Sequence, residues 1–171
     1  MSDESAPNYQ RAFAPHPEVF AAWAQLNAAI TDGMDSRRYA LATLAAARAI
    51  RSSYCSLAHG KMLVEEFDEP VAAIAANRHD AGLSPLDIAV MDLAELVATD
   101  AASVTESDRQ RLRDLGLSDH DIAQVVLTAA ARCFFAKTLD GLGARPDASY
   151  LELSDELRAV LVVGTPIDDR T

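Results

Sequence analysis

The chain has 171 residues, of which half are apolar, and a formal net charge of −11 at pH 7. This length predicts one compact domain with a substantial core, and the apolar share excludes a disordered chain. The negative charge argues against a surface for nucleic-acid phosphates or for anionic lipid.

The same composition bears on location. No apolar run reaches the roughly 20 residues that a membrane span needs, and the first residues lack the basic and apolar regions of a signal peptide. Two cysteines far apart do not predict a disulfide framework, which suits a reducing compartment. We expect a cytoplasmic protein with neither a membrane nor a nucleic-acid partner.

Helical signals follow one another along the chain, so we expect an all-α fold. Residues 1–16 are polar and contain two prolines, which predicts an extended arm before a single helical domain over 17–171. Serine or threonine followed three residues later by aspartate marks helix starts at Ser84, Thr105 and Ser118. The expected helices cover about 18–30, 36–51, 53–67, 70–77, 85–99, a stretch after 105, 119–139 and 154–161. Residues 160–163 are the only short strand candidate.

A thiol and an imidazole lie four residues apart at Cys55 and His59. On a helix, this spacing puts both on one face with Cβ atoms roughly 5–6 Å apart, so the imidazole is placed to take the thiol proton. Ser52 or Ser53 is suited to cap the helix, which puts Cys55 in the first turn, where the helix dipole favours a reactive thiolate. The alternative is an inert buried cysteine beside a core histidine.

These residues resemble a known family. The pattern Ser52-x-x-Cys55-x-x-x-His59 resembles the CxxCxxxH motif of AhpD-like alkylhydroperoxidases and carboxymuconolactone decarboxylases, with serine in place of the first cysteine. Residues 53–61 and 132–143 resemble the uncharacterised peroxidase-related branch, and the resemblance extends from about residue 17 onward. It implies an AhpD-like multi-helix domain that self-associates and in which Cys55 attacks a hydroperoxide.

The chain also departs from that family. Ser52 occupies the position of the resolving cysteine and cannot form a disulfide, and Ala40 occupies the position of the relay glutamate. The two-cysteine cycle therefore does not carry over, so the reductant would be an external thiol or Cys133. The resemblance also implies two related helical halves, and residues 43–48 do echo 127–132, although alanine-rich helices also match by chance.

Several residues around the motif are candidates for a supporting role. Tyr39 and Tyr54 could each replace the relay hydroxyl, and Glu66 lies two helical turns from His59, where it could orient the imidazole through water. Cys133 lies on an apolar helical stripe and is interpreted as a core thiol, the alternative being a distant resolving partner. The histidines show no metal-ligand spacing, and we expect neither a metal nor another cofactor.

Four cations stand out in this acidic chain: Arg48, Arg51, Arg132 and Lys137. They are interpreted either as surface ion pairs or as partners of a thiolate or carboxylate. The leading hypothesis is a peroxidase-related thiol oxidoreductase with Cys55 as nucleophile and His59 as base. The rivals are a carboxymuconolactone decarboxylase-like lyase, with Arg48 or Arg51 clamping a small carboxylate beside His59, and a non-catalytic helical oligomer.

Overall fold

The helix start signals of the sequence coincide with observed helix starts. In the computed structural model, which describes residues 6–169, the hydroxyls of Ser84, Thr105 and Ser118 each accept a hydrogen bond from the backbone N–H three residues later. The aspartate at that later position returns a bond to the capping residue, so each start is a complete capping box. Asp35 caps its helix through the N–H of Arg38 at 2.7 Å.

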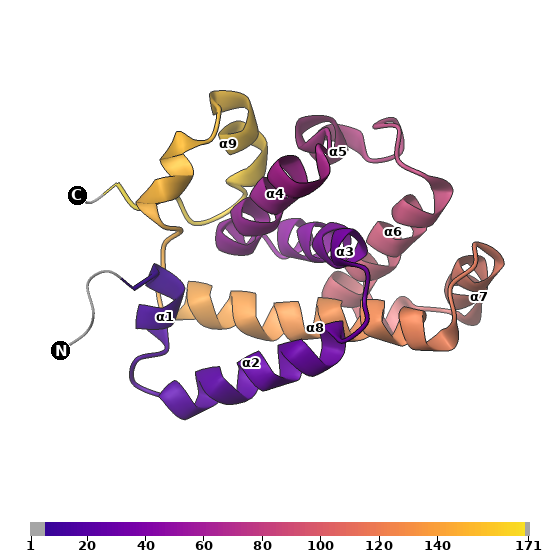
Figure 1. The fold of residues 1–171 in the computed structure, drawn as a ribbon, viewed down its shortest axis with the longest axis horizontal. Coiled ribbons are helices and arrows are strands. Elements are labelled where there is room, and N and C mark those ends of the chain that lie inside the picture. The colour runs from indigo at the N-terminus through magenta and orange to yellow at the C-terminus, as the bar shows by residue number, and fades with distance from the viewer. Residues whose placement is uncertain (1–5, 170–171) are drawn as a thin grey trace.

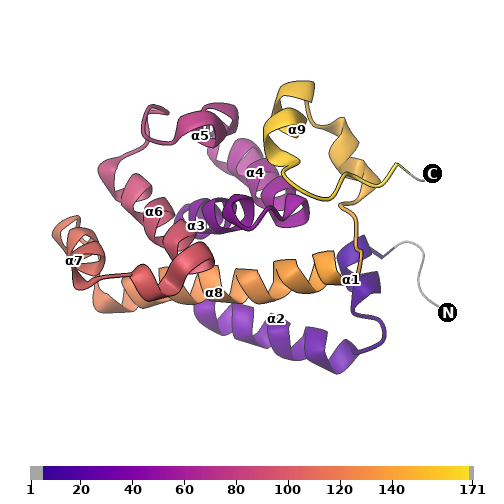
Figure 2. The same ribbon diagram turned by 180° about the vertical axis from the view of Figure 1, so that it is seen from behind.

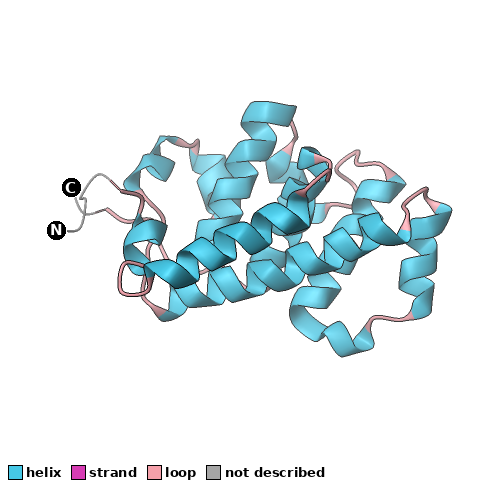
Figure 3. Cartoon of the chain, turned by 60° about the horizontal axis from the view of Figure 1, so that its bottom comes forward, coloured by secondary structure: helices cyan, strands magenta, loops and turns pink. Residues whose placement is uncertain are grey.

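Helices make up the architecture, as expected (Figure 1). The α-helices are α1 (Asn8–Ala12), α2 (Pro17–Thr31), α3 (Ser36–Ala49), α4 (Ser53–Phe67), α5 (Val71–Asn77), α6 (Pro85–Asp100), α7 (Glu106–Asp114), α8 (Asp119–Gly141) and α9 (Asp155–Leu161), and the 3-10 helices are η1 (Ala101–Ser103) and η2 (Ala148–Glu152). Between residues 6 and 169 the chain forms no strand, as Figure 3 shows. The strand candidate at 160–163 is wrong, because α9 continues through the first two of these residues.

Helix α3 forms the centre of the core. It lies among α4, α6 and α8, which Figures 1 and 2 show from opposite sides. Every residue from 40 to 47 is buried, and five of these eight are alanine. Such small side chains let the neighbouring helices approach α3 closely, which explains why an alanine-rich segment occupies the middle of the fold.

Helix α8 is more apolar than expected from the sequence. Its 23 residues are long and apolar enough, by length and composition, to cross a membrane, but 56% of its most apolar window is buried inside the protein. Leu139 and Val125 are completely buried, and the helix packs against α2, α3 and α6. These contacts are typical of the core helix of a globular fold.

The N-terminal arm is only partly as expected. Residues 1–5 of the predicted extended segment lie outside the described residues, whereas Asn8–Ala12 form α1. Phe13, which follows α1, is buried and stacks on Phe135 at a ring-centroid distance of 5.7 Å. The segment lies at one end of α8 (Figure 1), where its Phe13 ring adds to the aromatic packing.

A close backbone contact holds the C-terminal segment against the start of α4. The N–H of Gly164 donates to the hydroxyl of Ser53 at 2.8 Å, and a Cβ atom on Gly164 would lie 2.0 Å from the carbonyl oxygen of Arg51. Only a residue without a side chain fits at this distance.

We therefore expect Gly164→Ala to lower the free energy of unfolding by about 1–3 kcal/mol, because backbone must move to admit the methyl group. Gly141→Ala is the matched control, since nothing lies within 4 Å of a Cβ there. Thermal unfolding followed by circular dichroism measures both. Equal melting temperatures for the two variants would contradict the contact.

Candidate active site

Cys55 owes its position to a tight turn between α3 and α4. The N–H of Ser52 donates to the carbonyl of Ala47 at 2.8 Å and that of Arg51 to the carbonyl of Arg48 at 3.0 Å. With Arg51 in the left-handed region (φ 60°), this is a Schellman ending of α3. Helix α4 starts directly afterwards, so Cys55 is its third residue, where the helix dipole favours negative charge.

Ser52 fills the N-cap position of α4 but does not cap it through its side chain. Its hydroxyl is fully buried and makes no capping bond; the group with which it interacts is the Asp140 carboxyl. It does not line the cavity next to Cys55. Ser52 therefore belongs to the turn that places the thiol rather than to the surface that would meet a substrate.

Cys55 lies at a pocket of about 230 Å³ that is rich in aromatic side chains. Of the ten aromatic residues in the chain (one Trp, four Tyr and five Phe), seven line it. The lining residues are Tyr9, Phe20, Trp23, Tyr39, Tyr54, Cys55, Ala58, His59, Arg132, Phe135 and Tyr150. The structure thus brings Cys55, His59, Tyr39 and Tyr54 together in one pocket.

Arg132 of α8 provides the positive charge of this pocket. It is 5% exposed, and its Nη1 lies 3.8 Å from the sulfur of Cys55. Its Nη2 donates to the hydroxyl of Tyr39 at 2.6 Å, and its guanidinium lies 5.5 Å from the ring centre of Phe135. Among residues 6–169, no carboxylate forms an ion pair with it. A buried charge without a counter-ion is costly, and the Cys55 sulfur is the described group at 3.8 Å where a negative charge would compensate Arg132.

His59 enters the pocket as a neutral imidazole. Burial, and then the charge of Arg132, hold its pKa well below the usual 6.5. The residue is partly accessible, but the imidazole Nδ1 is buried and has no hydrogen-bond partner in the described chain. The ring of Tyr39 packs against it at 5.3 Å in a T-shaped arrangement. A neutral imidazole is the form that accepts a proton, but the thiol's own hydrogen-bond contact is with Arg132 rather than with His59.

The lowered pKa of His59 gives a pH dependence with a defined sign. Below about pH 6.5 this histidine is protonated in the unfolded chain but not in the folded chain. As the pH is lowered, the free energy of unfolding therefore falls by at most about 1.4 kcal/mol per pH unit. We expect His59→Gln, which removes the titration, to flatten the curve between pH 7 and 5. Urea unfolding of both proteins measures the difference, in which the carboxylates common to both cancel. Parallel curves would mean that His59 titrates normally.

The two tyrosines proposed as relays have structural partners. The Tyr54 hydroxyl donates to Asp147 and accepts from the N–H of Tyr9 at 3.2 Å. Burial and the bond to Asp147 raise the pKa of Tyr54, and burial raises the pKa of Tyr150 to about 12, so both stay protonated. Tyr39 bonds Arg132 and, at 3.3 Å, Asn27. Tyr54 therefore anchors α1, while Tyr39 orients the guanidinium.

Two other predicted residues lie away from the pocket. Glu66 is exposed and does not line the pocket, so the structure does not bring it together with the other predicted site residues. Cys133 is half-buried, and its sulfur lies 3.9 Å from the carbonyl of Ala98 on α6. Successive residues of a helix point about 100° apart, so Arg132 faces Cys55 while Cys133 faces α6. Burial raises the pKa of Cys133, which favours its unreactive thiol form.

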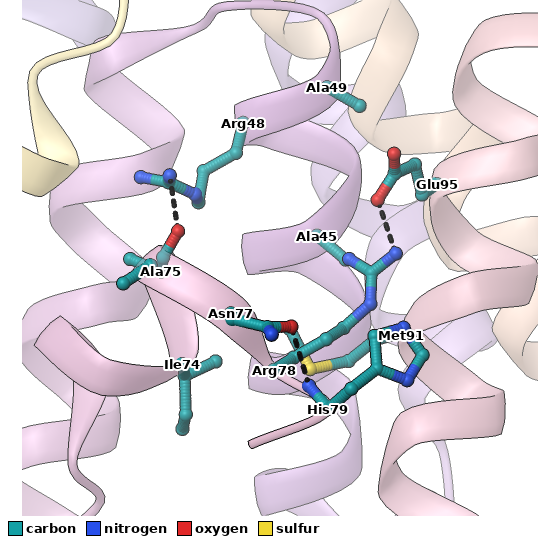
Figure 4. Close-up of a pocket in the computed structure, with 11 residues that line it drawn as sticks. Ala45, Arg48, Ala49, Ile74, Ala75, Asn77, Arg78, His79, Met91 and Glu95 are labelled. Carbon is teal, nitrogen blue, oxygen red and sulfur yellow. Dashed lines mark hydrogen bonds and ion pairs between the residues drawn. The ribbon is translucent and has the colours of Figure 1, made fainter. Parts of the chain in front are cut away.

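The arginines proposed as a carboxylate clamp are also placed elsewhere. Arg48 donates to the carbonyls of Val160 and Ala75, the latter at 2.9 Å, and so caps the ends of α9 and α5. It lines a second cavity of about 360 Å³ in which Arg78 pairs with Glu95 (Figure 4). Arg51 is exposed and donates to Val163. The cation at the Cys55 pocket is Arg132 instead.

Sequence reasoning missed most of the aromatic wall. Phe20 and Trp23 lie within the helix expected over about 18–30 and Tyr9 lies within the expected arm, and no motif marks any of the three. The available signal was the density of aromatic residues between positions 9 and 23. A motif identifies residues that are close in sequence, whereas this wall joins α1, α2, α3, α4, α8 and η2.

The fold so described is AhpD-like, an all-helical class found in several solved structures. One is described as the alkylhydroperoxidase AhpD core of an uncharacterised peroxidase-related protein from Ralstonia eutropha; it matches with a TM-score of 0.76 and 24% identity over 94% of this chain and 83% of its own. An uncharacterised peroxidase-related protein from Silicibacter sp. matches with a TM-score of 0.77 and 20% identity over 85% of this chain and 79% of its own.

A third structure, from Agrobacterium tumefaciens, is described as a protein of unknown function and putative antioxidant defence protein AhpD. It matches with a TM-score of 0.70 and 19% identity over 81% of this chain and 95% of its own. No protein-family model and no curated protein matches the sequence. At these identities the likeness establishes the fold alone.

Proposed function

We propose that this protein is a peroxidase-related thiol oxidoreductase that reduces hydroperoxides through Cys55. The observation that carries the proposal is the contact between Cys55 and Arg132, in which a buried cation has a thiol at 3.8 Å and no carboxylate among its described neighbours. A thiolate next to a cation is the nucleophilic form of cysteine. The AhpD-like fold, shared with proteins named as peroxidase-related, gives further support.

The chemistry requires a base, a nucleophile and a proton donor. His59, neutral because of its lowered pKa, takes the thiol proton directly or through a water molecule. The Cys55 thiolate then attacks the terminal oxygen of the hydroperoxide; an S–O bond forms, the O–O bond breaks and the alkoxide leaves. His59 returns its proton to the alkoxide, which gives an alcohol and the Cys55 sulfenic acid.

Reduction of the sulfenic acid completes the cycle. One thiol condenses with it to a mixed disulfide and water, and a second thiol displaces Cys55 and forms the free disulfide of the reductant. Ser52 contains no sulfur, so we propose an external thiol as reductant. Neither a metal nor another cofactor is needed for these steps.

A lyase or isomerase acting on a small lactone or carboxylate is the second candidate. The buried charge of Arg132 and the neutral His59 would then bind a carboxylate and move a proton, with no redox role for Cys55. Turnover of a lactone acid that persists in Cys55→Ala would favour it. The third candidate, a non-catalytic oligomer, is disfavoured by the aromatic pocket next to the thiol.

The test is intact-mass analysis after exposure to hydrogen peroxide or cumene hydroperoxide, with and without dimedone. We expect one oxygen atom to be added at Cys55 and one dimedone adduct to form there when the trap is present, because Cys133 faces α6 and is held as a thiol. If a Cys55–Cys133 disulfide is found instead, Cys133 and not an external thiol resolves the sulfenic acid. No change at either cysteine at millimolar peroxide would overturn the peroxidase proposal.

We also propose that the protein self-associates in the cytoplasm. Large apolar side chains are exposed on α2 and α8, namely Val19, Leu26, Leu127 and Phe134. Two of them, Leu127 and Phe134, are seven residues apart and so lie on one face of α8. Covering that face with a second copy would remove its apolar surface from water.

A further inference from the structure

Helix α1 covers the pocket that contains Cys55. The backbone N–H of Asn8 donates to Asp147 at 2.8 Å, and that of Tyr9 to the Tyr54 hydroxyl at 3.2 Å. The ring of Tyr9 meets that of Tyr54 at 6.0 Å, edge to face, and forms part of the pocket wall. Below this cover Cys55 is 2% exposed.

No internal thiol is placed to reduce Cys55. Ser52 carries a hydroxyl, and Cys133 points to Ala98 on α6. Cys55 and Cys133 are the only two cysteines of the chain. Electrons for an oxidised Cys55 must therefore arrive through the aromatic pocket.

The size of that pocket limits what can enter. A thiol that attacks a Cys55 disulfide must bring its sulfur to within about 2 Å of a cysteine sulfur. A protein dithiol presents its cysteine on a broad surface, whereas the cavity of about 230 Å³ holds only a small molecule. Arg132, which lines the cavity, favours the thiolate form of an incoming small thiol.

We propose that the reductant of Cys55 is a low-molecular-mass thiol that enters the aromatic pocket, and not a protein dithiol. This proposal rests on the proposed function for its place in the cycle. In each turnover two such thiols are oxidised to one disulfide, the sulfenic acid of Cys55 is reduced to the thiol, and its oxygen leaves as water.

The experiment uses the full-length Cys133→Ser protein, so that Cys55 is the only cysteine. Methyl methanethiosulfonate converts Cys55 into its methyl mixed disulfide without any peroxide. The modified protein is then treated with 2-mercaptoethanol or with reduced thioredoxin at equal thiol concentration, and intact mass follows the return of the free thiol. We expect 2-mercaptoethanol to act at least about tenfold faster, although a low-pKa protein dithiol is ordinarily the better reductant.

A variant of the cover gives a second measurement. Tyr9→Ala removes the ring over the pocket, and we expect it to accelerate reduction by thioredoxin much more than reduction by 2-mercaptoethanol. Asn8→Ala removes the side-chain bonds to the Arg145 carbonyl at 3.0 Å and to Asp168 at 3.5 Å, so it loosens α1 without changing the pocket wall and should act in the same direction. Circular dichroism verifies that both variants are folded.

Two outcomes would overturn the proposal. One is faster reduction by thioredoxin in the protein with Tyr9 intact. The other is failure of methyl methanethiosulfonate to label folded Cys55 when it labels the urea-unfolded chain. Because the mixed disulfide is prepared without peroxide, these outcomes are separate from failure of the peroxidase proposal, which would appear as an absence of sulfenic acid.

Discussion

Cys55→Ser is expected to reduce hydroperoxide consumption to the uncatalysed rate, because serine cannot form a sulfenic acid. Cys55 is the thiol that meets both Arg132 and the aromatic pocket. The measurement is loss of cumene hydroperoxide over time in the presence of 2-mercaptoethanol. The rate is expected to fall at least about a hundredfold, as for removal of a nucleophile in covalent catalysis.

Cys133→Ser is the matched control for this prediction. Its thiol contacts the Ala98 carbonyl and its pKa is raised by burial, so we expect nearly full activity. If the two variants lose activity equally, Cys133 takes part in the cycle. If Cys55→Ser stays active, the reaction does not pass through this thiol.

Arg132→Met is expected to slow alkylation of Cys55 by iodoacetamide at pH 7 by at least about tenfold, since a positive charge 3.8 Å from the sulfur favours the reactive thiolate. Methionine fills a similar volume without charge. The rate is measured from pH 5 to 10 in the Cys133→Ser background, and Arg132→Lys is the control that keeps a positive charge. An unchanged profile would mean that Arg132 is not the counter-ion of the thiolate.

His59 also affects the alkylation rate of the Arg132→Met variant, because Arg132 contributes to the lowered pKa of His59. Removing the guanidinium makes protonation of His59 easier, and an imidazolium in its place would partly restore a positive charge near the thiol. The double variant Arg132→Met, His59→Gln removes both charges. We expect it to alkylate at least as slowly as the single variant at pH 6.

The fold was predictable where local chemistry decides it. The capping residues Ser84, Thr105 and Ser118 identify helix starts to within a residue, because each satisfies backbone N–H groups that the helix leaves unpaired. The segment around α1 was misjudged for the opposite reason. Its helix is only five residues long and is held by tertiary bonds to Asp147 and Tyr54, which no local pattern encodes.

Part of the candidate site could be predicted from the sequence. The spacing of Cys55 and His59 indicated one helix face, and both do line one pocket. Arg132 was recognised as one of four cations, but its role depends on the crossing of α8 with α4, 77 residues away in sequence. The clamp assigned to Arg48 failed because its guanidinium bonds to the carbonyl ends of α5 and α9.

The aromatic wall also makes the pocket visible to spectroscopy. Trp23 is the only tryptophan of the chain, it lines the pocket, and its ring stacks on Phe135 at 4.0 Å with the Arg132 guanidinium 5.8 Å from its centre. All tryptophan fluorescence therefore originates beside Cys55, from an indole in contact with a cation. Entry of a ligand, displacement of α1 or oxidation of the thiol each alters the surroundings of that indole, so emission from the unlabelled protein reports on this one site.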